Sequence, residues 1–151
     1  MVNKPKQLGT AAETAVTRHA RTAGFPLAER RALAGGADLG DILLCPGVIV
    51  EVKAGKAAEQ ASDARIGAWL DETERERRNA NADVAVLVTK RAGVGHTNAG
   101  RWWAHWRLTD LARLRGYPTT LTVDDAPVRM TLDSALAQLR AGGYGTPLET
   151  S

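Results

Sequence analysis

The spacing of apolar and polar residues predicts helices alternating with strands in the first half of the chain. Small and apolar side chains recur three, four and seven residues apart over 8–23, which is typical of an amphipathic helix that ends at Gly24. Short apolar runs then predict three strands, at 27–33, 41–45 and 48–53. Because Cys45-Pro46-Gly47 favours a tight turn, we expect the last two strands to form an antiparallel hairpin.

A second helix and a buried strand are predicted after the hairpin. Residues 57–80 combine strong helix formers with opposite charges at helical spacing, which indicates a solvated helix face. Residues 83–90 are a run of Val, Ala and Leu that is reached through this helix, so we expect a strand parallel to 48–53. The remaining pattern predicts a glycine-containing loop at 92–100, a tryptophan-rich strand at 101–107, a short helix at 109–115, a hairpin near 124–125 and a final amphipathic helix over 132–139.

This order of elements predicts an α/β or α+β domain built on a mixed sheet. The 151 residues suffice for one domain, which we divide into a core at 1–107 and a C-terminal extension at 108–151 that packs on it and has a tail expected to be mobile. With 44% hydrophobic and 25% charged residues, wholesale disorder and a membrane protein are excluded. The single cysteine excludes an internal disulfide, and the lack of a signal peptide or membrane span predicts a cytoplasmic protein.

The net charge of +3 is unevenly distributed along the chain. Residues 1–35 hold six Lys or Arg against two acids, and residues 84–118 hold six against Asp110 alone. Between these segments, residues 36–53 hold three carboxylates and one lysine. An acidic centre with basic flanks suits a metal site that acts on a polyanion, although uneven charge also occurs on ordinary solvated surfaces.

Three ionisable residues of the predicted hairpin form the most informative pattern. Strand alternation places Glu51 and Lys53 on one face. If Leu44 pairs with Val48 across the turn, Asp41 falls opposite Glu51, with facing Cβ atoms roughly 5 Å apart. Two such carboxylates repel each other unless a cation lies between them, and oxygen ligands suit Mg²⁺ or Mn²⁺. Lys53 is then placed to orient a water or to neutralise a phosphate, whereas the alternative is an exposed cross-strand charge cluster.

The motif Gly-Ala-Asp38-Leu-Gly-Asp41-Ile, followed by Glu51-Val52-Lys53 and preceded by a helical Glu13, lies within a segment of about Lys4 to Lys90. This segment resembles the PD-(D/E)XK nuclease superfamily, and within it the Holliday junction resolvases of archaeal and phage type. The resemblance implies a restriction-endonuclease-like core of helix-strand-strand-strand-helix-strand order, a Mg²⁺ cofactor that Mn²⁺ can replace, and a homodimer. It implies metal ligands at Asp41, Glu51 and the main-chain carbonyl of Val52, a catalytic Lys53, and a supporting catalytic and metal-binding carboxylate at Glu13. The chain departs from the family pattern where Gly40, instead of the nominal proline, precedes Asp41.

Two further candidates and Glu13 each have a second interpretation. Asp38 could assist the site or compete for the metal, but Asp also initiates turns, and that propensity favours the turn. Glu13 lies at the edge of the apolar stripe of its helix, a position that permits either a site or solvent. Gln60 lies one turn into the second helix, where it could reach a metal-bound water or serve as an ordinary polar helix residue.

The residues that suit phosphate contacts lie mainly in the two basic segments: Lys4, Lys6, Arg18, Arg30, Arg31, Lys90, Arg91 and Arg101. Phosphate contacts need only positive charge, so the sequence assigns none of them individually. Alternation along the tryptophan-rich strand places Trp102 and Trp106 on one face and Trp103 with His105 on the other. One face is expected in the core, and the other could stack on unpaired bases or meet a partner subunit.

Three functions fit these observations. The first is a Mg²⁺-dependent endonuclease that resolves branched DNA, above all four-way junctions, and it requires a homodimer because symmetric cutting needs two sites and one chain offers one. The second is a restriction-type or repair nuclease that acts on duplex or single-stranded DNA. The third is a non-catalytic DNA-binding module of the same fold. The resemblance and the Ala/Arg-rich composition indicate a phage or bacterial origin, with the host cytoplasm as the location of a phage protein.

Overall fold

A six-stranded mixed sheet forms the centre of the protein, in the order β1-β2-β3-β4-β5-β6. The computed structural model describes residues 4–31, 40–118 and 125–148. The strands are β1 (Glu29–Arg30), β2 (Ile42–Cys45), β3 (Val48–Lys53), β4 (Val84–Thr89), β5 (Trp103–Arg107) and β6 (Pro127–Thr131). The pair β3 and β4 is parallel and the other neighbouring pairs are antiparallel, so the predicted mixed α/β class is confirmed.

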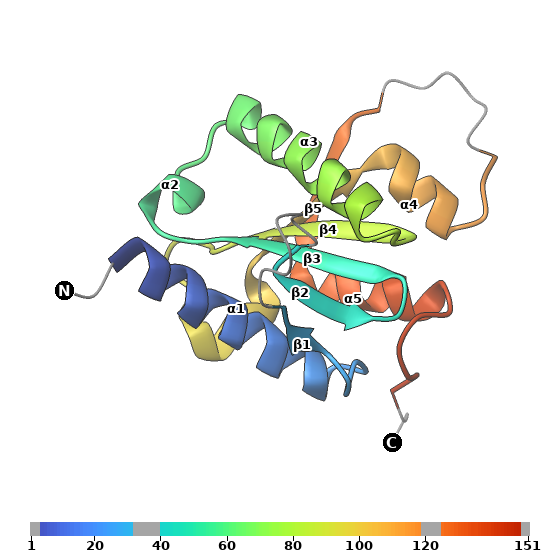
Figure 1. Cartoon of the computed structure of the whole chain (residues 1–151), viewed down its shortest axis with the longest axis horizontal. Helices are drawn as coiled ribbons and strands as arrows, with labels where there is room; N and C mark the ends of the chain where they lie inside the picture. The colour runs from blue at the N-terminus through green and yellow to red at the C-terminus, as the bar shows by residue number, and fades with distance from the viewer. Residues whose placement is uncertain (1–3, 32–39, 119–124, 149–151) are drawn as a thin grey trace.

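Helices cover both faces of this sheet (Figure 1). They are α1 (Lys4–Thr22), α2 (Lys56–Glu59), α3 (Asp63–Asn79), the 3₁₀ helix η1 (His96–Arg101), α4 (Leu108–Leu114) and α5 (Leu132–Ala141). The long helix α1 and the C-terminal helix α5 lie on one side of the sheet and α3 lies on the other (Figure 1). The connection from β3 through α2 and α3 to β4 is the predicted helical crossover.

Strand β3 separates an apolar face from a charged one. Its residues Val48, Val50 and Val52 pack in the main core with α1 and α5. The intervening Glu51 and Lys53 point to the opposite side, where Lys53 meets α3. The alternation predicted from the sequence is therefore confirmed, and it places the candidate chemistry between the sheet and α3.

The predicted helix over 57–80 is interrupted in the structure. Helix α2 ends at Glu59 and α3 begins at Asp63. The break follows from a helix cap, because the Ser62 hydroxyl accepts a hydrogen bond of 3.1 Å from the amide of Arg65. The predicted solvated face is present, since Asp71, Arg75 and Arg78 are exposed and Arg78 pairs with Glu74 at 3.2 Å. Glu76, which the prediction did not consider, is buried, with only 1% of it exposed.

Three other predicted elements also differ from the structure. Strand β1 covers only Glu29–Arg30 of the expected 27–33 among the described residues, although the amide of Arg31 still donates to the carbonyl of Asp41 at 2.8 Å. The expected loop at 92–100 contains most of η1. In place of a tight hairpin near 124–125, helix α4 connects β5 to β6, and Asp124 lies outside the described residues.

The C-terminal segment contributes to the same sheet and core. Strand β6 pairs with β5 along its whole length, and α5 buries Leu132, Ala135, Leu136 and Leu139 completely or nearly so.

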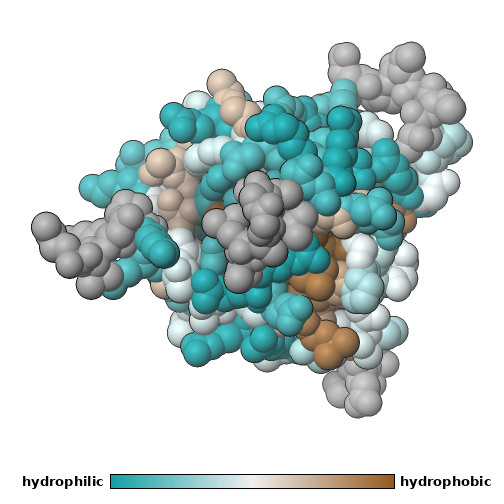
Figure 2. Space-filling model, viewed as in Figure 1, coloured by the Kyte–Doolittle hydropathy of each residue, from teal (hydrophilic) through white to brown (hydrophobic). Residues whose placement is uncertain are grey.

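The face shown in Figure 2 is largely hydrophilic over α1 and α3, with a hydrophobic patch near the turn between α1 and β1. That turn contains Leu27, of which 77% is exposed. Among the described residues, no helix has both the length and the apolar character needed to cross a membrane.

Candidate active site

Asp41 and Glu51 face each other across the β2–β3 hairpin. Ile42 pairs with Val50 and Leu43 with Ile49, which is the predicted register. Asp41 precedes β2, and its amide donates to the carbonyl of Val50 at 3.1 Å, so Asp41 lies beside Glu51 at the end of the ladder and not in a regular strand pair with it. The pairing nearer the turn also differs from the prediction, because a β-bulge after Leu43 makes Cys45 and not Leu44 the partner of Val48.

The backbone of β3 orients the Asp41 carboxylate. The amide of Val52 donates a hydrogen bond of 2.8 Å to Oδ2 of Asp41. This contact directs the side chain across the hairpin toward Glu51, whose carboxyl group lies within hydrogen-bonding reach. Val52 therefore contributes its amide to the site, whereas the family resemblance assigns a role to its carbonyl.

Burial and a neighbouring carboxylate favour the protonated forms of both carboxyl groups. Burial, followed by the charge of Glu51, raises the pKa of Asp41 to about 8. Burial, followed by the proximity of Glu76, raises the pKa of Glu51 to about 9. Only 4% of Glu51 is exposed, and its Oε2 has no hydrogen-bond partner among the described residues. The surrounding described residues therefore do not provide hydrogen-bond partners for all the carboxylate oxygens of this pair.

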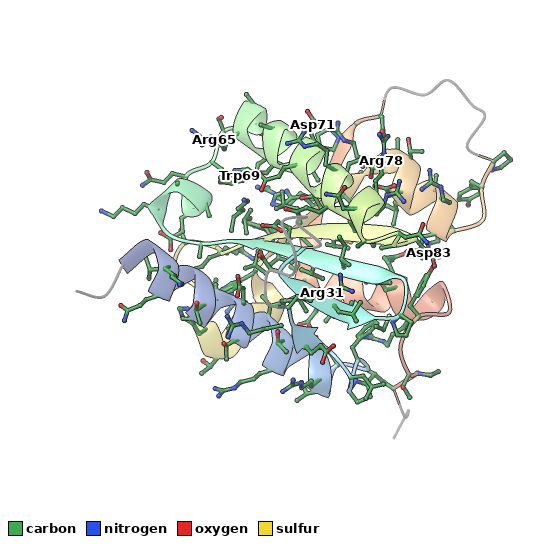
Figure 3. All side chains as sticks on the ribbon, viewed as in Figure 1. Arg31, Arg65, Trp69, Asp71, Arg78 and Asp83 are labelled. Carbon is green, nitrogen blue, oxygen red and sulfur yellow. The ribbon has the colours of Figure 1, made fainter. Side chains whose placement is uncertain are left out.

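Lys53 supplies the positive charge next to this pair. Its Nζ lies 3.5 Å from Oε1 of Glu51 and 3.1 Å from Oε1 of Glu72. Burial alone would lower the pKa of the Lys53 ammonium, but the two carboxylates raise it above its usual value. The ammonium also lies 5.7 Å from the ring of Trp69, which projects from α3 with Arg65 one turn before it (Figure 3). Lys53 is accordingly a fixed cation at neutral pH.

Helix α3 adds two carboxylates that the sequence analysis did not select. Carboxylate oxygens of Glu51, Glu72 and Glu76 all lie within 4.8 Å of one another. We refer to Asp41, Glu51, Glu72 and Glu76 as the carboxylate cluster. The available signal was the helical repeat, since Leu70, Thr73 and Glu76 follow one another at three-residue spacing and are the buried residues of α3. An acid on such a stripe indicates a buried role.

The other predicted site residues lie at the edge of the cluster or apart from it. Oε2 of Glu13 accepts hydrogen bonds from Arg30, at 2.9 Å from Nη2, and Glu13 is near enough to Asp41 for its charge to raise the Asp41 pKa. Gln60 is exposed at the end of α2 and contacts none of the cluster. Asp38 lies outside the described residues.

The predicted phosphate-binding residues fall into two groups. Lys6, Arg18 and Arg101 have exposed side chains that form no ion pair with the described residues. Arg30 pairs with Glu13, Lys90 pairs with Glu59 at 2.7 Å, the Arg91 guanidinium lies over Trp103, and Arg31 is half-buried. Of Lys4 only the backbone is described. The first group is thus more accessible to a polyanion.

No family model, curated protein or solved structure matches this chain. The resemblance described above therefore depends on the quoted residues, and the chemistry of the site has to be argued from its geometry.

The raised pKa values of Asp41 and Glu51 predict that the metal-free protein loses stability as the pH rises. An unfolded carboxyl group titrates near pH 4, whereas these two titrate at about 8 and about 9 in the folded state. The folded state therefore holds more protons between these limits, so the stabilisation present below pH 4 is lost on the way to pH 9. Urea unfolding in EDTA should show this decrease, and it should be smaller in Glu51→Gln. Equal slopes in the two proteins would contradict the assignment.

Proposed function

We propose that the protein is a Mg²⁺-dependent endonuclease that hydrolyses phosphodiester bonds in DNA, with a restriction-endonuclease-like core. One observation carries this proposal: the carboxyl groups of Asp41 and Glu51 lie next to each other at the end of the β2–β3 hairpin, with the Lys53 ammonium 3.5 Å from Glu51. Apart from the short additional helix α2, the order α1, β1, β2, β3, α3, β4 also agrees with the core that the resemblance implies. Exposed cations at Lys6, Arg18 and Arg101 are available to the DNA backbone.

The carboxylate pair fits a divalent cation of the Mg²⁺ class. All of its donors are oxygen atoms, which Mg²⁺ and Mn²⁺ prefer. The buried Oε2 of Glu51 lacks a partner among the described residues. Burial, followed by a neighbouring carboxylate, raises the pKa of both groups, and this neighbour is Glu51 for Asp41 and Glu76 for Glu51. A cation held by Asp41 and Glu51 would relieve both features and would displace protons as it binds. Bound there, it would supply Lewis-acid activation of the phosphate and of the attacking water.

The residues of the chain have distinct roles in this proposal. Asp41 is held in position through the Val52 amide, and Glu51 provides the second carboxylate. Lys53 remains protonated and therefore acts as a cation that stabilises the negative charge that develops on the phosphate, rather than as a base. Glu72 fixes the Lys53 ammonium through its contact of 3.1 Å. Glu13 is a supporting carboxylate whose position depends on Arg30.

A four-way junction is the substrate that we propose, with a homodimer as the active form. Resolution requires two symmetric cuts, and each chain contains one carboxylate pair of this kind among its described residues, so a two-fold dimer brings the required two sites. We expect sedimentation velocity to give the mass of two chains at micromolar concentration. A monomer that still makes paired cuts would contradict this arrangement.

A cleavage panel separates the proposed function from its alternatives. The wild type is incubated with a labelled four-way junction, a flap, a linear duplex and a single strand, each with Mg²⁺, Mn²⁺ or EDTA. Paired cuts in the junction that require the metal support the resolvase. Equal cutting of linear DNA supports a restriction-type or repair nuclease instead. If the protein binds DNA but does not cleave it with Mg²⁺ or Mn²⁺, the protein is a non-catalytic DNA-binding module and not an enzyme.

A further inference from the structure

A cavity of about 270 Å³ lies on the same face of the sheet as the carboxylate cluster, between the start of α3 and strands β5 and β6. Thr89 lines it and is the neighbour of Lys53 on the adjacent strand, and Trp103 is the next residue in that row. Strands in a sheet lie about 4.8 Å apart, so Trp103 is about 10 Å from the strand position of Lys53. The cavity is therefore within one or two nucleotides of the proposed cleavage site.

One wall of this cavity combines an aromatic ring with a guanidinium group. Trp103 is half-buried, and the guanidinium carbons of Arg91 and Arg129 lie 4.0 and 4.3 Å from its ring centroid. Arg129 lines the cavity together with Trp103. Nucleobases stack on aromatic rings and on guanidinium planes, whereas a planar cationic surface of this kind has no evident role in the packing of the core.

One of the polar groups that line this cavity is a buried, neutral histidine. Only 5% of His105 is exposed, and its Nε2 lies 3.0 Å from Oγ1 of Thr89. Burial, followed by the charge of Arg129, lowers the pKa of His105 to about 4, so the ring is uncharged at neutral pH. Its Nδ1 has no hydrogen-bond partner among the described residues and remains available to a ligand.

The charge around the cavity favours a base over a phosphate. The carboxylates of Glu59 and Asp63 also line it, and Lys90 is already paired with Glu59 at 2.7 Å. Carboxylates repel a phosphate but accept hydrogen bonds from the amino groups of a base. A flat, uncharged ligand with hydrogen-bonding edges meets each of these features.

We propose that this cavity binds one unpaired base of a single-stranded segment of DNA. The position of that segment next to the scissile phosphate rests on the proposed nuclease function. The binding of a base in the cavity does not depend on that function. The proposal gives the substrate a single-stranded region beside the cut, as at a flap or at an opened junction. Base recognition is shared among Trp103, Arg129 and His105, and the two arginines also attract the strand.

Binding measured in EDTA tests this proposal independently of cleavage. Fluorescence anisotropy compares a labelled single strand, a duplex and a fully abasic strand of the same length. The variants are Trp103→Leu and Arg129→Ala, and the control is Arg115→Ala, which removes an exposed arginine at the end of α4. We expect Trp103→Leu and Arg129→Ala to weaken single-strand binding about ten-fold, while their duplex affinity falls no further than that of the control. The wild type should bind the abasic strand about ten-fold more weakly as well.

Two results would overturn the proposal: equal losses for single strand and duplex, or wild-type binding of the abasic strand that is as tight as that of the normal strand. If Trp103→Leu fails to fold, Arg129→Ala decides the question, because Arg129 is exposed. If the protein binds single strands through Trp103 but cuts no DNA, the base-binding cavity would be supported and the nuclease function would be rejected. If the wild type cleaves DNA, but neither Trp103→Leu nor Arg129→Ala weakens single-strand binding, the nuclease function would be supported and the base-binding cavity would be rejected.

Discussion

Replacing Asp41 by asparagine should abolish Mg²⁺-dependent cleavage while it stabilises the metal-free protein. The amide side chain keeps an oxygen that can accept the hydrogen bond from the Val52 amide, which measures 2.8 Å in the wild type. It loses the negative charge that a divalent cation requires. Metal assistance is worth several kcal/mol, so we expect a loss of about 10³-fold in the rate of junction cleavage.

The stability of Asp41→Asn should change in the opposite direction from its activity. Burial and the charge of Glu51 raise the pKa of Asp41 to about 8, and the pKa of Glu51 is about 9, so the wild type carries two repelling buried carboxylates only at about pH 9 and above. Removing one of them should stabilise the protein by about 2 kcal/mol at pH 9 and by almost nothing at pH 4. Urea unfolding in EDTA measures this difference. Glu29→Gln is the matched control, since Glu29 is exposed on β1 and should change neither quantity.

The variant Lys53→Ala should also lose cleavage, but it should become less stable. Lys53 is the ammonium between Glu51 and Glu72, at 3.5 and 3.1 Å. Loss of a positioned charge that stabilises the transition state costs roughly 10²-fold to 10³-fold in rate. At pH 7 Glu51 is protonated, so Glu72 is the carboxylate that loses its cation. We expect a destabilisation of only about 1 kcal/mol, because Lys53 and Glu72 are partly exposed.

The comparison of these two variants separates chemistry from folding. Both should bind the junction and fail to cut it, although one is more stable and the other less stable than the wild type. Unfolding therefore cannot account for both losses. Lys56→Ala provides the control for charge removal, because Lys56 is exposed on α2. If Lys53→Ala cleaves the junction at the wild-type rate, Lys53 has no catalytic role, and only the acidic residues remain as candidates.

The β2–β3 hairpin could be predicted because the residues that determine it are close together in the sequence. A two-residue alternation and a turn of Pro46 and Gly47 determine which side chains share a face, and they predicted the pairing of Ile42 with Val50, which brings Asp41 next to Glu51. The detail of the turn could not be predicted, since the bulge between Leu43 and Cys45 depends on how the closed loop fits its surroundings. The parallel strand β4 was predictable for a similar reason, as a long crossover permits that direction.

The role of α3 could not be predicted in the same way. Helical periodicity indicated a charged helix, and charged helix faces are usually solvated. Glu76 is buried because α3 packs across the sheet against Glu51, a contact between residues that are far apart in the sequence. The position of Glu72 beside Lys53 has the same origin. Such contacts depend on the angle and height of the helix above the sheet, which no local pattern encodes.

The sequence by itself determined the mixed α/β class, the apolar and charged faces of β3, and the proximity of Asp41 to Glu51, because these follow from short-range periodicity and turn chemistry. Only the tertiary structure decided which charges meet beyond the hairpin. It brought Glu72 and Glu76 to Lys53 and Glu51, and it placed Arg91 and Arg129 against Trp103 beside a buried His105. The reason is physical: burial and long-range packing change the pKa values and partners of ionisable groups, and both arise only when distant segments close around them.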